Sequence, residues 1–300
     1  MGKIADSLTR AQRARERRGG APGLEARALG RGPGWVVEDV LCTLGPGDRA
    51  FEERHSLYRI AVVGAGTFAC RSGDGRELLT PGALLLGNPG QSFECNHEDG
   101  SGDRCLAFGY SADYFERLMA DAGAGGTARL RALRVPPLRR LAPLVAEACA
   151  AWTARDACVV DGLWEDLALR VAAGAARLAA QPARTPRSPR NAERGVARAV
   201  RLVDRDPCAP LRLDELAREA SLSPFHFLRT FARVTGVTPH QYVLRARLRR
   251  AAVRLAADDT RVVDVALDAG FDDVSNFNRA FRAEFGCAPL EHRRRLRRPR

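Results

Sequence analysis

The last third of this 300-residue sequence contains one unit twice, and this repeat limits the possible folds more than any other feature. The segment 213–239 (LDELAREASLSPFHFLRTFARVTGVTP) aligns with 262–289 (VVDVALDAGFDDVSNFNRAFRAEFGCAP) once the second copy is allowed one extra residue in its turn. The residues that match across a spacing of 50 are Phe227 with Phe277, Arg229 with Arg279, Phe231 with Phe281, Gly236 with Gly286 and Pro239 with Pro289. Recurrence at a fixed spacing indicates that one backbone unit is built twice.

Each copy has the pattern of a helix-turn-helix. A short helix is expected over 213–220 and again over 262–269, interrupted by Ser221 in the first copy and by Gly270 in the second. Small residues at these breaks permit a tight turn between two helices. The two copies, 213–236 and 262–286, therefore predict two helix-turn-helix motifs in one chain.

The second helix of each copy is expected to be amphipathic, starting after the N-cap Ser223 or Asp273. Phenylalanines at three- and four-residue spacing form an apolar face that packs against the partner helices. The opposite faces carry Phe225, His226, Arg229 and Arg233 in the first copy, and Ser275, Asn278, Arg279 and Arg282 in the second. A polar, Arg-bearing face at a helix N-terminus is what entry into the DNA major groove requires.

The segment 239–258 between the copies lacks internal Pro and Gly and predicts a helix approaching 30 Å, at ~1.5 Å per residue. That length is comparable to the roughly 34 Å between successive major-groove faces of one duplex. The distribution of charge also favours binding of a polyanion by this part of the chain. Residues 191–300 carry 22 Arg and 14 acidic residues, a net charge of +8 out of the total of +12. The sequence contains a single lysine, so the abundance of Arg as such carries less weight than its position.

The last 110 residues resemble the two-motif DNA-binding domain of the AraC/XylS family of bacterial transcription regulators. The residues that carry the resemblance are LDELA with Ser221, Phe227 and Arg229; Arg247, Ala251 and Leu255; and Ala266, Gly270, Phe271, Ser275, Phe277, Arg279, Phe281, Phe285, Gly286 and Pro289. The resemblance implies DNA-binding roles for Ser223, Phe225, His226, Arg229, Val274, Ser275, Asn278 and Arg279. His292 departs from the family pattern, which has an aromatic residue there.

The resemblance also implies the partners of the protein: a double-stranded DNA operator, a second copy in a homodimer, RNA polymerase and a small-molecule effector. It implies sequence-specific regulation of transcription in the cytoplasm and no enzymatic activity. The sequence identifies neither the effector nor the operator, and it does not distinguish an activator from a repressor.

The predicted fold class is α+β. Short β-rich runs over 35–110 predict a small antiparallel barrel or sandwich, and this part is similar to the cupin-like effector domain of the family. A helical dimerisation segment is expected over 111–181, a Pro/Arg linker over 182–190, and the all-α DNA-binding domain over 191–300. Residues 1–34, rich in Gly and basic residues, are expected to form a flexible basic arm.

The helical segment contains an apolar stripe made of Leu163, Leu167, Val171 and Leu178, broadened by Trp164 and Ala168. Such a stripe must be covered, either by the barrel or by a second subunit.

The β-rich region lacks the metal-binding set of enzymatic cupins, because its only histidines are His55 and His97. We therefore expect no cofactor and no cupin-type metal. One local cluster, Cys95, His97 and Cys105, with Cys70 on a neighbouring strand, could hold an effector or a soft metal or sense oxidants. The alternative is that these are small buried cysteines of a β-core.

Other functional classes find less support in the sequence. A cupin-type or alkyl-transfer enzyme would need a triad of metal ligands or an activated cysteine in a recognisable motif, and the sequence shows neither. A DNA-compacting protein is a further alternative, and it would bind DNA without sequence preference. No apolar run reaches the roughly 18 residues of a membrane span, and the N-terminal stretch has no signal-peptide core. The eight cysteines form no CxxC pair, so neither a disulfide framework nor a zinc ribbon is indicated.

Overall fold

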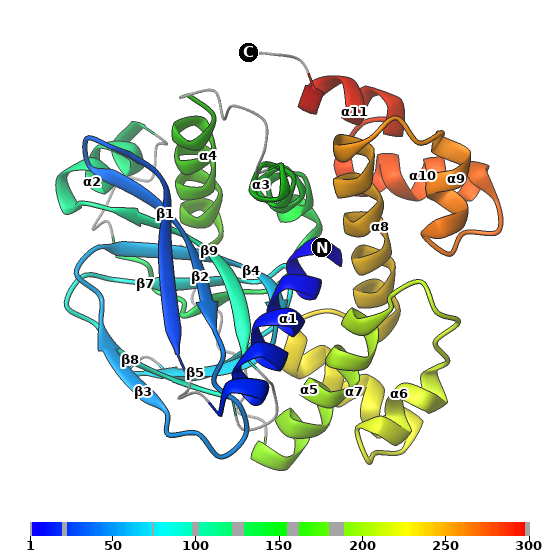
Figure 1. The fold of residues 1–300 in the computed structure, drawn as a ribbon, viewed down its shortest axis with the longest axis horizontal. Helices are drawn as coiled ribbons and strands as arrows, with labels where there is room; N and C mark the ends of the chain where they lie inside the picture. Colours follow the sequence, from blue (N-terminus) through cyan, green and yellow to red (C-terminus); the bar gives the residue numbers. More distant parts are fainter. Residues whose placement is uncertain are drawn as a thin grey trace.

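A β-rich part comes first in the chain and a purely helical part follows it (Figure 1). The computed structural model describes residues 2–19, 23–73, 75–97, 102–121, 129–154, 162–179 and 189–297. The predicted α+β class is confirmed. Residues 182–188 of the expected linker, 182–190, lie outside the described residues. Among the described helices, none is long and apolar enough to cross a membrane.

The β-rich part consists of two antiparallel sheets. Its strands are β1 (Leu24–Gly32), β2 (Trp35–Cys42), β3 (Phe51–Arg54), β4 (Tyr58–Gly66), β5 (Phe68–Ser72), β6 (Gly75–Leu79), β7 (Leu84–Gly87), β8 (Ser92–Asn96), β9 (Asp103–Tyr110) and β10 (Arg134–Val135). The larger sheet has the order β1-β2-β9-β4-β7-β10 and the smaller one β3-β8-β5-β6.

The larger sheet is covered on both faces, which explains why every residue of β9 is buried. On one face, Val63 and Cys105 join a core with Phe68 and Phe93 of the smaller sheet. On the other face, alternate residues such as Phe108 join a core with the helices of the first half of the chain. This alternation follows from the two-residue period of a strand.

The described residues of the segment 1–34, namely 2–19 and 23–34, are not the flexible basic arm that the sequence predicts. Residues Gly2–Arg18 form α1, whose Ile4 and Leu8 are 1% and 6% exposed in the core. Two buried apolar residues four positions apart give α1 one apolar face, while polar and charged residues such as Arg10 and Arg13 are exposed. Arg15 forms an ion pair with Asp48 at 2.7 Å, and β1 extends the larger sheet by pairing with β2.

Helices of the segment 111–181 cover the larger sheet. They are α2 (Ala112–Asp121), the 3₁₀ helix η1 (Arg139–Leu141), α3 (Ala142–Thr153) and α4 (Gly162–Ala179). Leu167 and Val171 of α4 are fully buried, and α4 contacts β1, β2 and β4. The apolar stripe is therefore covered by the chain's own sheet, the first of the two alternatives, and its centre is not free to bind a second subunit.

The helical part consists of α5 (Arg190–Arg205), α6 (Leu213–Glu219), α7 (Pro224–Thr235), α8 (Pro239–Ala257), α9 (Val262–Asp268), α10 (Val274–Phe285) and α11 (Pro289–Arg297). Figure 1 shows α6 and α7 near one end of α8, and α9 and α10 near its other end. With 19 residues, α8 is about 28 Å long at ~1.5 Å per residue.

The two parts pack directly against each other through α8 and α3. Polar contacts cross the same boundary: Arg134 of β10 donates to the carbonyl oxygen of Thr235 at 3.0 Å, and Arg245 of α8 donates to that of Pro137 at 2.7 Å. The guanidinium of Arg249, 4% exposed, donates to the carbonyl oxygen of Pro81 at 3.3 Å. The Pro81 turn lies directly before β7 of the larger sheet.

The burial of α1 predicts a large effect of truncating its apolar face. We expect Leu8→Ala to lower the free energy of unfolding by about 2–4 kcal/mol, because it leaves a cavity in the core. The neighbouring Thr9 is exposed, so Thr9→Ala should change stability by less than about 0.5 kcal/mol. Urea denaturation of both variants measures the difference, and equal effects would mean that α1 does not pack on the sheet.

Candidate DNA-binding surface

The first helix-turn-helix consists of α6 and α7. Its turn contains Ser221, the only residue other than glycine with positive φ (57°) in the described part of the chain. The turn is closed by backbone bonds from the N–H of Ser221 to Arg218 and from the N–H of Leu222 to Ala217, both 2.9 Å. The predicted break at Ser221 is thus the point where the backbone becomes left-handed.

The second helix-turn-helix consists of α9 and α10 and repeats this geometry. Gly270 has φ 76° at the position that corresponds to Ser221. The Asp273 carboxylate caps α10 by accepting from the backbone N–H groups of Ser275 and Asn276 at 2.9 and 3.1 Å. These two bonds lower the pKa of Asp273. Ser223, in contrast, occupies the N-cap position of α7 without a side-chain capping bond among the described residues.

Both second helices bury the phenylalanine face that the sequence predicts. Phe227 and Phe231 of α7 are fully buried in one core, and Phe277 and Phe281 of α10 are fully buried in another. Each helix ends at a left-handed glycine, with φ 80° and 73° at Gly236 and Gly286 respectively. The buried face fixes the rotation of each helix, and therefore decides which residues face outward.

The structure exposes nearly all of the residues that the family resemblance implicates in DNA binding. On α7 and its cap these are Ser223, Phe225, His226 and Arg229; on α10 they are Ser275, Asn278 and Arg279. Val274 differs, because it is only partly exposed and packs against the second core. The side chain of Val274 is thus partly committed to holding the start of α10.

Phe225 and Arg229 form one exposed unit on α7. Phe225 is 71% exposed, an unusual state for a large aromatic residue, and the Arg229 guanidinium carbon lies 5.8 Å from its ring centroid. Arg279, at the equivalent place on α10, donates to the side-chain oxygen of Asn276. Both side chains are exposed, and no described ion pair includes either of them, so an anion or a base edge can reach both guanidinium groups.

Arg247, which the sequence marks as part of the family pattern, holds the framework rather than facing outward. From α8 its guanidinium donates to the carbonyl oxygens of Pro207 at 2.7 Å, Ala209 at 2.9 Å and Gly270 at 3.2 Å. One side chain therefore connects the turn of the second motif to the segment that precedes α6. The planar guanidinium carries several N–H donors in a fixed geometry, so an arginine can bond to three carbonyl groups at once.

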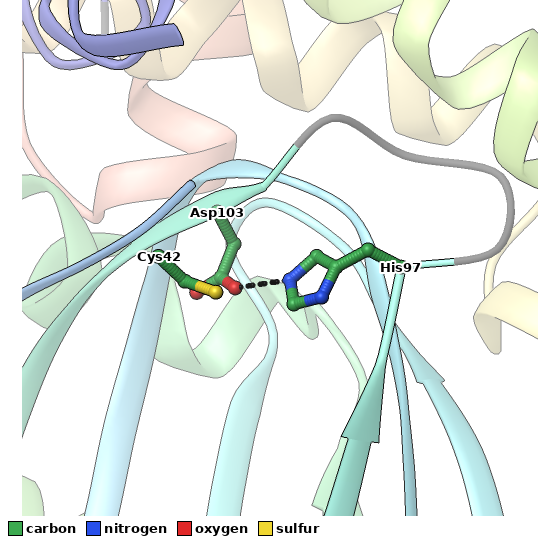
Figure 2. Close-up of side chains that lie close together, drawn as sticks. All are labelled: Cys42, His97 and Asp103. Atoms are coloured by element: carbon green, nitrogen blue, oxygen red, sulfur yellow. Dashed lines mark hydrogen bonds and ion pairs between the residues drawn. The ribbon is translucent and has the colours of Figure 1, made fainter. Parts of the chain in front are cut away.

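The structure adds two residues, Cys42 and Asp103, to the surroundings of the predicted sulfur and imidazole cluster in the β-rich part. Cys95 lies directly opposite Cys70 across β8 and β5, which confirms Cys70 on a neighbouring strand. The atoms that come within 4.8 Å of one another belong instead to Cys42, His97 and Asp103 (Figure 2). Cys105 stays adjacent, because its thiol donates to the Asp103 carboxylate at 3.0 Å. Neither Cys42 nor Asp103 is among the predicted residues; Cys42 is distant along the chain and is brought close by the pairing of β2 with β9.

An exposed pair of equivalent helices, joined by one helix and preceded by a β-rich domain, defines a double helix-turn-helix DNA-binding protein with an attached sensor. Residues 216–295 match the family model described as a helix-turn-helix domain, and residues 44–171 match that of the AraC-like ligand binding domain. The chain is 33% identical over 97 residues to the regulatory protein SoxS of Salmonella typhimurium, covering 32% of this chain and 91% of that protein. The chain belongs to the AraC/XylS family of DNA-binding transcription regulators.

Other similar proteins include the right origin-binding protein of Escherichia coli, 38% identical over 85 residues, or 28% of this chain and 29% of that protein. Among solved structures, an AraC-type regulator from Chromobacterium violaceum is 28% identical, with a TM-score of 0.34, over 35% of this chain and 94% of that one. ToxT from Vibrio cholerae is 13% identical, with a TM-score of 0.34, over 88% of this chain and all of that one.

His292 occupies the position where the family has an aromatic residue. It is 4% exposed, and its ring centroid lies 5.3 Å from that of Phe281 and 5.4 Å from that of Phe285. Burial lowers the pKa of His292 to about 4. The imidazole is therefore neutral in the folded protein and packs as an aromatic ring.

This burial predicts a loss of stability in acid. An unfolded histidine has a pKa of about 6.5, so below that pH the unfolded chain binds a proton that the folded chain does not. The contribution of His292 should be fully present above pH 6.5 and fall by about 2 kcal/mol between pH 7.5 and pH 5. His292→Phe should remove this part of the pH dependence in urea denaturation. His240→Gln, at an exposed position, is the control for loss of a histidine and should leave the free energy of unfolding at pH 7.5 within about 0.5 kcal/mol of the wild type.

We expect the two exposed arginines of α10 to differ in role: Arg279 contacts a base, and Arg282 contacts the DNA backbone. Arg279→Ala should reduce the preference for operator over random DNA by about 1–3 kcal/mol, because a base contact is lost. Arg282, exposed in the last turn of the same helix, is the matched control. Arg282→Ala should weaken binding to both DNAs alike, and competition binding assays compare the ratios. An unchanged ratio for Arg279→Ala would exclude base reading by this residue.

Proposed function

We propose that α7 and α10 enter two successive major-groove segments of one operator, and that the β-rich domain adjusts this binding in response to a small-molecule effector. The observation that carries the proposal is the recurrence of one surface: in both helices a buried phenylalanine face directs an arginine, Arg229 or Arg279, outward. Two copies of one reading surface in a single chain fit two half-sites on one duplex.

The chemistry of the two surfaces differs, which favours unequal half-sites. On α7, Phe225 offers apolar contact for a thymine methyl group, and Arg229 beside it offers a bidentate donor for guanine. On α10, Ser275, Asn278 and Arg279 offer polar contacts, with Asn suited to adenine and Arg to guanine. The N-termini of both helices and the surrounding arginines supply phosphate contacts that position the protein.

The length of α8 supports simultaneous binding of both helices. It is about 28 Å long, slightly less than the roughly 34 Å repeat of the duplex. A modest bend of the DNA toward the protein brings the two groove segments within reach, and bending by 40–90° costs about 1–6 kcal/mol.

Signal transfer between the domains is proposed to run through the contacts of α8 and α7 with the β-rich part. Arg134 of β10 holds the carbonyl of Thr235, the last residue of α7, and also bonds to Glu77 of β6 at 2.8 Å. An effector that shifts β10 or β6 changes the position of α7 relative to α8. A ligand acts in this way only by the difference in its affinity for the two arrangements.

The remaining partners are proposed from family membership. The protein acts in the cytoplasm as a homodimer, contacts RNA polymerase and performs no catalysis. Because the centre of the apolar stripe on α4 is already buried within the chain, we propose that the dimer contact lies on another surface.

Footprinting at increasing salt tests the proposed function. On DNA from the neighbourhood of its own gene, the full chain should protect a discrete site that persists above ~0.15 M salt, with two protected segments about one helical turn apart. A protein that binds only through charge would lose protection without showing a discrete site. The double variant Arg229→Ala, Arg279→Ala should behave in that second way, and a footprint unchanged by it would contradict the proposal.

A further inference from the structure

Three polar side chains meet at one end of the β-rich domain. Figure 2 shows Cys42, His97 and Asp103 pointing toward one another from three strand ends, with the His97–Asp103 bond dashed. Their ligand atoms all lie within 4.8 Å of one another, and His97 Nε2 is 2.7 Å from the Asp103 carboxylate. All three residues are buried, at 2%, 3% and 6% exposure respectively.

Strand pairing holds this arrangement. Cys42, the last residue of β2, lies directly opposite Asp103, the first residue of β9. His97 follows β8, which belongs to the smaller sheet. The ligands therefore come from two sheets, and Cys42 and Asp103, 61 residues apart in the chain, are held in place by backbone pairing, while His97 directly follows a paired strand.

The buried carboxylate of Asp103 has no arginine or lysine partner among the described ion pairs. Its described partners are the ring of His97 and the thiol of Cys105. The neighbouring Arg104 points to the opposite face of the sheet, where it forms an ion pair with Asp39 at 2.6 Å. A buried carboxylate without a cationic partner is costly, and so is a buried imidazole nitrogen without a hydrogen bond.

His97 presents the second unexplained feature. Its side chain is fully buried, and Nδ1 has no hydrogen-bond partner in the described part of the chain. A ring nitrogen in this state is either an uncompensated cost or a position for a ligand. A cation among the three ligand atoms supplies positive charge beside the Asp103 carboxylate, and His97 coordinates it through Nε2, the ring nitrogen that faces Asp103.

We propose that Cys42, His97 and Asp103 bind a soft divalent cation of the Zn²⁺ type, a property separate from DNA binding. Sulfur, imidazole and carboxylate are all ligands that Zn²⁺ accepts, at about 2.3, 2.0–2.1 and 2.0–2.2 Å. Tetrahedral coordination at these distances separates ligand atoms by about 3.3–3.8 Å, so shifts of about 1 Å complete the site. Cys105 supplies the fourth ligand or orients Asp103 through its hydrogen bond.

Binding is coupled to proton release. A buried cysteine such as Cys42 is a thiol at neutral pH when no metal is bound. The cation takes the thiolate as ligand, and the thiol proton leaves to solvent. No electron is transferred, and no other reactant is needed.

Titration of the full-length chain with Co²⁺ and Zn²⁺, after chelation and dialysis under reducing conditions, tests the site. We expect one equivalent of Co²⁺ to produce a thiolate-to-metal charge-transfer band in the near ultraviolet, and Zn²⁺ to displace it. Cys42→Ser, His97→Asn and Asp103→Asn should each weaken binding by about 100-fold or more, since ligand loss exceeds the 10–100-fold cost of outer-shell changes. Cys149→Ser removes a buried thiol in α3, outside the cluster, and should leave the titration unchanged.

The outcomes separate clearly. Absence of a stoichiometric site in the wild type, absence of the thiolate band, or binding that survives all three substitutions would overturn the proposal. Circular dichroism identifies any variant that fails to fold; for such a position, metal-dependent protection of the wild-type Cys42 from alkylation, read by mass spectrometry, decides the point instead. Because these measurements contain no DNA, a failed footprint leaves them standing, and a failed titration leaves the proposed regulation standing.

Discussion

The placement of α8 is the constraint on which the rest of the structure depends. Its residues enter three separate cores: Tyr242 and Ala246 pack with the first helix-turn-helix, Leu248 and Leu255 with the second, and Val253 with the helices and sheet of the β-rich domain. A helix buried on several sides cannot rotate or slide without opening all three cores. The separation of the two recognition helices and their relation to the sensor are therefore set by one element.

Much of the DNA-binding half could be predicted from the sequence, because its signals are local. The phenylalanine spacing gives the buried face, the left-handed breaks fall on Ser221 and Gly270, and the outward positions follow from helical period alone. The α+β class followed from the change in periodicity after the strands. The roles of individual outward residues at DNA remain predictions.

What the sequence could not give depends on contacts between distant segments. The N-terminal residues look like a charged arm because Ile4 and Leu8 are the main apolar signal of α1, and their burial depends on the sheet beneath them. Likewise, Cys42 joins His97 and Asp103 through the pairing of β2 with β9, and no spacing rule connects residues so far apart. For α4, the apolar stripe showed that a surface had to be covered but did not show what covers it.

The contact between Arg249 and the Pro81–Gly82 turn also has a consequence for how the two domains can vary. A Cβ added at Gly82 would lie 2.8 Å from Arg249 Nη1, and φ at Gly82 is 88°, so any larger residue meets both the guanidinium and backbone strain. The sensor turn and the middle of α8 thus fit only as a matched pair. Replacing the β-rich domain of this chain by another would keep this contact only if the residues on both of its sides were exchanged together.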